Sequence, residues 1–184
     1  MILSRIIALI LLLLIFPIFM IISLVIIFDS GTPIFYKQKR LGQKNKEFLL
    51  IKFRTMNQET PEIASHLMEN PKEYYTRMGP FLRKFSIDEI PQLINIIKGE
   101  MLFIGPRPAL HNQQDLIDIR TNCGIHKIKP GITGWAQVNG RDQLSIQDKV
   151  DYEKYYLKNR NILFDIRILI MTIKQLLNPR GVSH

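Results

Sequence analysis

Cysteine is almost absent from this chain: Cys123 is the only one in 184 residues. An internal disulfide is therefore excluded, and nothing in the sequence requires an oxidising compartment. Two phosphate-binding patterns, the Walker loop and the G-x-G-x-x-G turn, are also missing. The histidines are too scattered to predict a clustered His/Cys metal site. They are His66, His111, His126 and His184.

Acidic residues are in the minority, with 16 Asp and Glu against 25 Lys and Arg, which gives a formal net charge of +9. A strongly basic protein usually meets polyanions such as nucleic acid, anionic lipid or phosphorylated substrates. The basic residues are not interleaved with aromatic ones, as a stacking platform for single-stranded nucleic acid requires. We therefore expect lipid or phosphorylated partners and no nucleic acid.

Charge is absent from residues 6–28. A spanning helix needs roughly 20 apolar residues, so this run predicts a membrane segment. The alternative is a cleaved signal peptide, which has a shorter apolar run and a small-residue cleavage site that is missing here. Pro17 lies near the middle of the run and predicts a break. Either a kinked helix spans the bilayer, or the chain turns at Pro17 and returns to the same face on two arms of roughly 16 Å each.

Basic residues are scarce before this run and frequent after it. Arg5 precedes it, and the residues that follow it closely are Lys37, Lys39, Arg40, Lys44 and Lys46. The positive-inside tendency places the flank with more Lys and Arg in the cytoplasm. We therefore expect a membrane-embedded segment over residues 1–29 and a cytoplasmic domain over residues 30–184.

The pattern after the apolar run predicts an α+β fold that is mostly helical. Residues 34–39 and 48–56 are β-like and flank a polar turn, which predicts a small β-hairpin. Ser145 and Asp148 resemble a capping box at the start of a helix over residues 145–158. Other expected helices cover residues 61–69, 74–85, 91–98 and 162–177, and a loop is expected over residues 111–123. The last helix is amphipathic, so it suits either the core or the membrane interface.

Two neighbouring carboxylates, Asp88 and Glu89, precede Pro91. A purely structural explanation is that they favour a helix dipole and form a capping box with Ser86. Proline is tolerated only in the first turn of a helix, so the helix that contains Pro91 leaves both carboxylates at its mouth. There they can bind Mg²⁺, and one can attack phosphorus as a nucleophile.

Cations near turns are candidates for phosphate binding. Arg107 lies between Pro106 and Pro108, whose fixed φ angles hold a planar guanidinium suited to bidentate phosphate contacts. The glycine-rich segment 131–140 offers backbone N–H groups to an anion. Any one cation taken alone is better explained as a solvated surface charge. The others near turns or helix starts are Lys52, Arg54, Arg83 and Arg141.

Four blocks together resemble the bacterial sugar transferases, also called monotopic phosphoglycosyl transferases. They are residues 52–56 (KFRTM), 86–93 (SIDEIPQL), 98–108 (KGEMLFIGPRP) and 130–141 (PGITGWAQVNGR). One block is weak, but four in order behind an apolar N-terminal run are specific. The resemblance covers nearly the whole chain and is to the small form that has only the catalytic domain.

The resemblance implies transfer of a sugar 1-phosphate from a UDP-sugar to undecaprenyl phosphate, with release of UMP, at the cytoplasmic face of the bacterial inner membrane. In the family the dyad aspartate, here Asp88, attacks the β-phosphate, and the lipid phosphate then displaces it. Glu89 matches the glutamate beside Mg²⁺, and Arg107 and Arg83 match basic residues at the phosphates. The family also implies a re-entrant N-terminal helix with interfacial helices beside it, although Phe16 stands where serine often precedes the proline.

Two other functions stay open at this stage. A non-enzymatic basic module anchored to the membrane explains the charge and the apolar run, but not the dyad or the arginine loop. An enzyme that moves only the glycosyl group would release UDP instead of UMP. The sequence names neither the sugar, the glycan pathway nor the oligomeric state.

Overall fold

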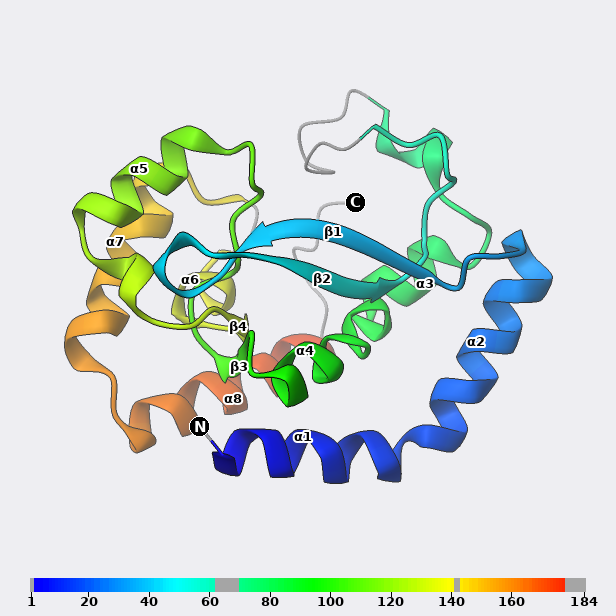
Figure 1. The fold of residues 1–184 in the computed structure, drawn as a ribbon, viewed down its shortest axis with the longest axis horizontal. Coiled ribbons are helices and arrows are strands. Elements are labelled where there is room, and N and C mark those ends of the chain that lie inside the picture. Colours follow the sequence, from blue (N-terminus) through cyan, green and yellow to red (C-terminus); the bar gives the residue numbers. More distant parts are fainter. Residues whose placement is uncertain (1, 62–69, 141–142, 178–184) are drawn as a thin grey trace.

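The computed structural model describes residues 2–61, 70–140 and 143–177 of the chain. Two N-terminal helices follow the lower and right edges of the view in Figure 1, and a two-stranded hairpin crosses the middle. The remaining helices pack around this hairpin. The α+β class predicted from the sequence, mostly helical with a small hairpin, is confirmed.

The apolar N-terminal run forms two helices, α1 (Ile2–Leu14) and α2 (Phe16–Ser30), that meet at an angle of 65°. Pro17 lies in the first turn of α2. In a continuous helix its ring would clash with the preceding turn, so the chain breaks before it and a new helix begins. Among the described residues no single helix has both the length and the apolarity to cross a bilayer, whereas this bent pair would qualify on those two criteria. The break at Pro17 is therefore observed, and the re-entrant path is consistent with it.

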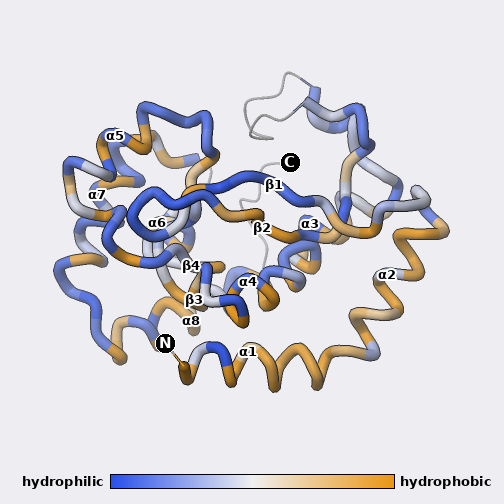
Figure 2. The backbone as a smooth tube through the Cα atoms, viewed as in Figure 1, coloured by the Kyte–Doolittle hydropathy of each residue, from blue (hydrophilic) through white to orange (hydrophobic). Residues whose placement is uncertain are grey.

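Apolar side chains cover much of the outer surface of three helices: α1, α2 and α8 (Ile162–Leu177). Figure 2 shows hydrophobic residues along almost the whole of α1 and α2. Phe28 is 87 % exposed and Leu177 is 81 % exposed. Monomeric soluble proteins rarely expose contiguous apolar surface on this scale. We call the exposed apolar side chains of these three helices the apolar belt.

The hairpin consists of β1 (Phe35–Leu41) and β2 (Glu47–Phe53), paired antiparallel with Phe35 opposite Phe53 and Leu41 opposite Glu47. Its turn contains Lys44 and Asn45, both in the left-handed backbone region. The hairpin predicted from the sequence is confirmed. β2 buries Phe48, Leu50, Ile51 and Phe53, and Lys52 near its end lines the site described below.

Helix α4 (Gln92–Lys98) packs between β2 and the N-terminal helix α1. Ala8 of α1 and Ile96 of α4 are fully buried in this contact. Arg5 Nη2 donates to the carbonyl of Lys98 (3.0 Å), and Lys129 Nζ donates to the carbonyl of Gly99 (2.6 Å). Two cations therefore cap the negative end of α4.

A second sheet, absent from the sequence prediction, joins β3 (Leu102–Ile104) and β4 (Gly131–Thr133) in parallel. Between these strands lies α5 (Gln114–Asn122), and after them come α6 (Trp135–Val138) and α7 (Ile146–Asn159). A buried ion pair ties α5 to α7. In it, Nε and Nη2 of Arg120 donate to the two carboxylate oxygens of Glu153.

Several helix predictions are confirmed. α4, α7 and α8 lie where expected, and the Ser145 hydroxyl accepts from the Asp148 N–H at 3.1 Å, as a capping box requires. The helix expected over residues 61–69 falls almost entirely outside the described residues.

Two predictions are wrong. The helix expected over residues 74–85 begins only at α3 (Gly79–Lys84), because Tyr75 pairs with Met56 in a β-bridge and thereby leaves helical geometry. The loop expected over residues 111–123 contains α5, whose buried face includes Leu116 and Ile117. The rest of this segment is mostly polar, so its apolar residues show only a weak helical periodicity.

Candidate active site

The dyad, Asp88 and Glu89, lies on a tight turn between α3 and α4. Ser86 has a left-handed backbone (φ 54°), which directs the chain into the 3₁₀ turn η4 (Ile87–Glu89). Pro91 then caps α4. The dyad is therefore placed just before the mouth of α4, as the position of Pro91 predicts.

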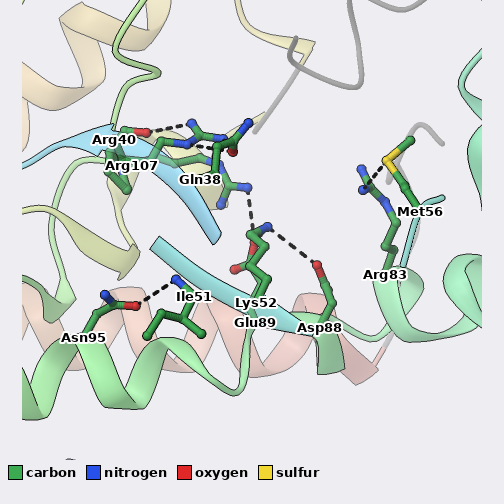
Figure 3. Close-up of polar contacts among 11 residues, drawn as sticks. Gln38, Arg40, Ile51, Lys52, Met56, Arg83, Asp88, Glu89, Asn95 and Arg107 are labelled. Carbon is green, nitrogen blue, oxygen red and sulfur yellow. Dashed lines mark hydrogen bonds and ion pairs between the residues drawn. The ribbon is translucent and has the colours of Figure 1, made fainter. Parts of the chain in front are cut away.

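Both dyad carboxylates are buried, at 5 % exposure for Asp88 and 7 % for Glu89. Lys52 Nζ, from β2, lies 2.8 Å from Glu89 Oε1 and 3.5 Å from Asp88 Oδ2 (Figure 3). Burial raises the pKa of the Asp88 carboxyl, and the Lys52 ammonium offsets part of this rise. Asp88 thus combines poor solvation with a nearby cation, a setting in which a carboxylate can act as a nucleophile.

Arg107 reaches the dyad from the opposite wall. Its Nη2 lies 3.1 Å from Glu89 Oε1, the same oxygen that Lys52 contacts. Two cations from distant parts of the chain therefore converge on one carboxylate oxygen. An entering phosphate group can compete with Glu89 for both of them, because charge-assisted hydrogen bonds to phosphate are strong and frequently bidentate for arginine.

The loop that carries Arg107 is held in place by β1. Arg40 Nη1 donates to the Pro108 carbonyl at 2.9 Å, and the Leu41 N–H donates to the Ala109 carbonyl at 3.0 Å. The Arg40 guanidinium is itself fixed by Gln38 Oε1, which accepts from Nε (3.0 Å) and Nη2 (2.6 Å). The sequence analysis did not predict this role of Arg40. Its position on a hairpin strand does not indicate that it contacts a loop so distant in the chain.

Three glycines allow the backbones around this loop to approach closely. A Cβ on Gly134 would lie 2.1 Å from the Gly105 carbonyl oxygen, and one on Gly131 would lie 2.1 Å from the Gly105 nitrogen. The Gly131 N–H donates to the Pro106 carbonyl at 3.0 Å. These glycines therefore support the arginine loop, and the Gly131 N–H is already bonded within the protein.

Arg83 approaches the dyad from the other side (Figure 3). Its guanidinium lies 5.2 Å from the centre of the Tyr75 ring, and Nη1 lies 3.7 Å from Met56 Sδ. Arg83 and Asp88 line the same pocket. The structure thus brings together Lys52, Arg83 and Arg107 around the dyad, as the sequence predicted.

Arg54 is placed differently from the other predicted cations. Its guanidinium is buried and donates to the carbonyls of Ser30 (2.6 Å), Gly31 (2.7 Å) and Thr32 (3.1 Å). Arg54 therefore caps the end of α2 and ties this helix to β2, so we do not retain it as a phosphate ligand. Arg141 lies outside the described residues.

A pocket of about 520 Å³ opens above the dyad and extends to both sides of it. One side, which we call the α5 arm, lies between β1 and the helices α5 and α7. Its lining includes Gln38, Arg40, Leu110, Gln113, Arg120 and Lys149. The opposite side, which we call the Tyr75 arm, is lined by Met56, Asn57, Gln58, Thr60 and Tyr75.

Asn95 is a second residue that sequence reasoning missed. It is fully buried on α4, where its amide nitrogen donates to the carbonyl of Leu49 (2.8 Å) and to Glu100 Oε2 (2.7 Å). Its amide oxygen accepts from the Ile51 N–H at 3.1 Å. One amide therefore fixes α4, the helix that follows the dyad turn, against the strand that carries Lys52 (Figure 3).

A metal ion at this site would depend on the dyad. Across the described ranges no cluster of three or more His, Cys, Asp and Glu side chains is arranged to hold a metal. Mg²⁺ usually keeps several waters and takes one or two carboxylates together with substrate phosphates. Asp88 and Glu89, beside a pocket that Lys52, Arg83 and Arg107 also line, fit this kind of site.

Comparison with known proteins agrees with this geometry. The profile of the family described as bacterial sugar transferase matches residues 1–179. The uncharacterized sugar transferase EpsL of Bacillus subtilis is 39 % identical over 156 residues, which cover 84 % of this chain and 75 % of EpsL. The exopolysaccharide production protein ExoY of Rhizobium meliloti is 34 % identical over 185 residues, which cover 92 % of this chain and 81 % of ExoY.

A longer relative has a more specific name. The UDP-glucose:undecaprenyl-phosphate glucose-1-phosphate transferase of Escherichia coli is 37 % identical over 174 residues, which cover 90 % of this chain but only 37 % of that protein. The family profile spans nearly the whole chain, and the matched range contains the dyad. By these matches the chain belongs to the bacterial sugar transferase family.

Proposed function

We propose that the protein transfers a sugar 1-phosphate from a UDP-sugar to undecaprenyl phosphate, releases UMP and thereby initiates assembly of a membrane-linked glycan. The substrates come from the names of relatives, which specify UDP-glucose in Escherichia coli and UDP-N-acetylgalactosamine in Aeromonas hydrophila. The observation in this chain that carries the proposal is the buried Asp88 on the wall of a pocket that Lys52, Arg83 and Arg107 also line.

The reaction that this arrangement supports has two displacement steps. An oxygen of the Asp88 carboxylate forms a bond to the β-phosphorus, and the bond from that phosphorus to the bridging oxygen breaks, so UMP leaves with the electron pair. An oxygen of undecaprenyl phosphate then attacks the same phosphorus, and Asp88 departs as a carboxylate. The product is a sugar joined to the lipid through a diphosphate.

The cations would stabilise the charge that moves in these steps. Lys52 and Arg107 share Glu89 Oε1 and line the pocket, so both are placed to bind the oxygens of an entering diphosphate. Mg²⁺ held by Asp88 and Glu89 would neutralise further negative charge on the diphosphate. Glu89 would keep Lys52 and Arg107 oriented before the substrate enters.

The apolar belt supports placement of the protein at a membrane. We propose that α1 and α2 enter the bilayer and return to the cytoplasmic face of the bacterial inner membrane, with α8 lying in the interface. The break at Pro17, the exposure of Phe28 and the basic residues after the run support this placement. A bilayer surface would also deliver the acceptor lipid beside the dyad.

Product identity tests the proposed reaction. The purified protein, supplied with undecaprenyl phosphate, Mg²⁺ and a panel of UDP-sugars, is expected to release UMP from at least one of them. Release of UDP would mean that only the glycosyl group moves. Absence of nucleotide release across the panel would favour a non-enzymatic, membrane-anchored module.

A further inference from the structure

The two arms of the pocket differ in chemistry on either side of the dyad. The α5 arm holds the cations Arg40, Arg120 and Lys149. The Tyr75 arm holds mainly amide, hydroxyl, thioether and aromatic groups. Its cations are Arg83, which lies against the Tyr75 ring, and the buried Arg54, which is already bound to backbone carbonyls. A donor with a diphosphate at the dyad must place its nucleoside in one arm and its sugar in the other.

The α5 arm has the length that a nucleoside needs. Tyr36, Gln38 and Arg40 alternate along β1 and line the pocket, and Tyr36 lies opposite Lys52 in the strand register. The four residue steps from Tyr36 to Arg40 correspond to roughly 14 Å of extended strand. The floor of this arm therefore extends well beyond the dyad.

The side chains of the α5 arm are also rigidly held. Arg120 binds Glu153 side-on through Nε and Nη2, so its Nη1 edge is turned away from Glu153. Arg40 is fixed by Gln38 and by the Pro108 carbonyl. Apolar Leu110 and fixed polar groups together suit a flat base whose edge carries carbonyl and N–H groups.

The Tyr75 arm presents a group that lacks a partner. The Tyr75 hydroxyl is buried, lines the pocket and has no hydrogen-bond partner among the described residues. Buried hydroxyls are usually hydrogen-bonded, so this one is suited to a ligand. With the amides of Asn57 and Gln58 nearby in the lining, the arm fits a ligand rich in hydroxyl groups.

We infer that the α5 arm binds the nucleoside monophosphate half of the donor and that the Tyr75 arm binds its sugar, an assignment that rests on the proposed function. UMP then leaves along β1, past Arg107 and Arg40. Gln113 reads the nucleoside, and Tyr75 contacts the sugar. Sugar choice therefore depends on the segment around Tyr75, whereas the α5 arm serves the part that all UDP-sugars share.

Equilibrium binding of UMP to the full-length protein in lipid nanodiscs tests the assignment without requiring the sugar to be known. Gln113→Ala is expected to weaken UMP binding about five- to tenfold, because one polar contact is lost. Its side chain makes no hydrogen bond among the described residues, so the fold should be unaffected. The matched control is Gln114→Ala, at the neighbouring exposed residue whose side chain bonds Asp118, and it should bind UMP like the wild type.

Tyr75→Phe tests the other arm. It removes an unpaired hydroxyl and keeps the ring under Arg83. UMP binding should stay within twofold of the wild type, while KM for the UDP-sugar that the wild type uses should rise. Weakened UMP binding in Tyr75→Phe together with normal UMP binding in Gln113→Ala would assign the arms the other way round and overturn the inference. Normal UMP binding in both variants would also overturn it. Failure of the wild type to bind UMP at all would instead refute the proposed nucleotide donor.

Discussion

Asn95→Ala is expected to damage both stability and catalysis, although Asn95 does not line the pocket. The substitution removes three hydrogen bonds and leaves the Ile51 N–H without its buried acceptor. An unsatisfied buried donor costs about 1–3 kcal/mol, and a hydrogen bond to a charged group such as Glu100 contributes about 1.5–3 kcal/mol. The expected loss in free energy of unfolding is about 3–5 kcal/mol, allowing for partial relaxation.

For a chain of this size the loss corresponds to a fall in Tm of about 6–20 °C. Thermal unfolding in detergent micelles measures it, with Asn122→Ala as the control, since Asn122 is exposed at the end of α5. At a temperature well below both transitions, kcat/KM should still fall at least about tenfold, because α4 no longer holds the dyad in register with Lys52. A Tm within 2 °C of the control would show that the Asn95 amide does not fix this helix.

Four further outcomes are expected. Asp88→Asn should abolish turnover yet raise Tm at pH 7. Burial raises the pKa of the Asp88 carboxyl, so the free energy of unfolding of the wild type falls as the pH rises through that pKa. The neutral amide of the variant does not ionise and therefore avoids this loss of stability. Unchanged UMP release by this variant would rule out Asp88 as the nucleophile. Arg107→Lys should cost about 2–4 kcal/mol in kcat/KM, whereas Arg77→Lys at an exposed position should change little; a loss below threefold would place Arg107 away from the phosphates. Chelation should remove activity and Mg²⁺ should restore it, and full activity in chelator would argue against a metal. Ile2→Cys in a Cys123→Ser background should resist impermeant thiol reagents in spheroplasts, and its modification would contradict the re-entrant path.

The local features of this fold were accessible from the sequence. Ser145 with Asp148 marked the start of α7, two β-like segments around a polar turn marked the hairpin, and Pro17 marked the break between α1 and α2. Each of these signals depends on neighbours a few residues apart, where backbone sterics and capping dominate.

The features that were missed depend on contacts between distant residues. The parallel β3–β4 pair and the anchoring of α4 by Asn95 join segments that no periodic pattern links. Arg54 was predicted at the phosphates from its charge, but its guanidinium donates to the backbone carbonyls at the end of α2. Charge alone could not distinguish these roles, because a C-terminal helix end and a phosphate both attract a guanidinium.

The packing of α4 directly on α1 sets how far the reacting group stands from lipid. Packed helices have axes about 8–10 Å apart, and the turn that carries Asp88 leads directly into α4, which packs on a helix that we propose to be immersed. With α1 placed in the bilayer as we propose, a lipid phosphate at the headgroup level would reach the dyad while its prenyl tail stays in the bilayer. The acceptor would then need no extraction step. The two substrates would arrive by different routes, the UDP-sugar by diffusion in three dimensions and the lipid by diffusion in two.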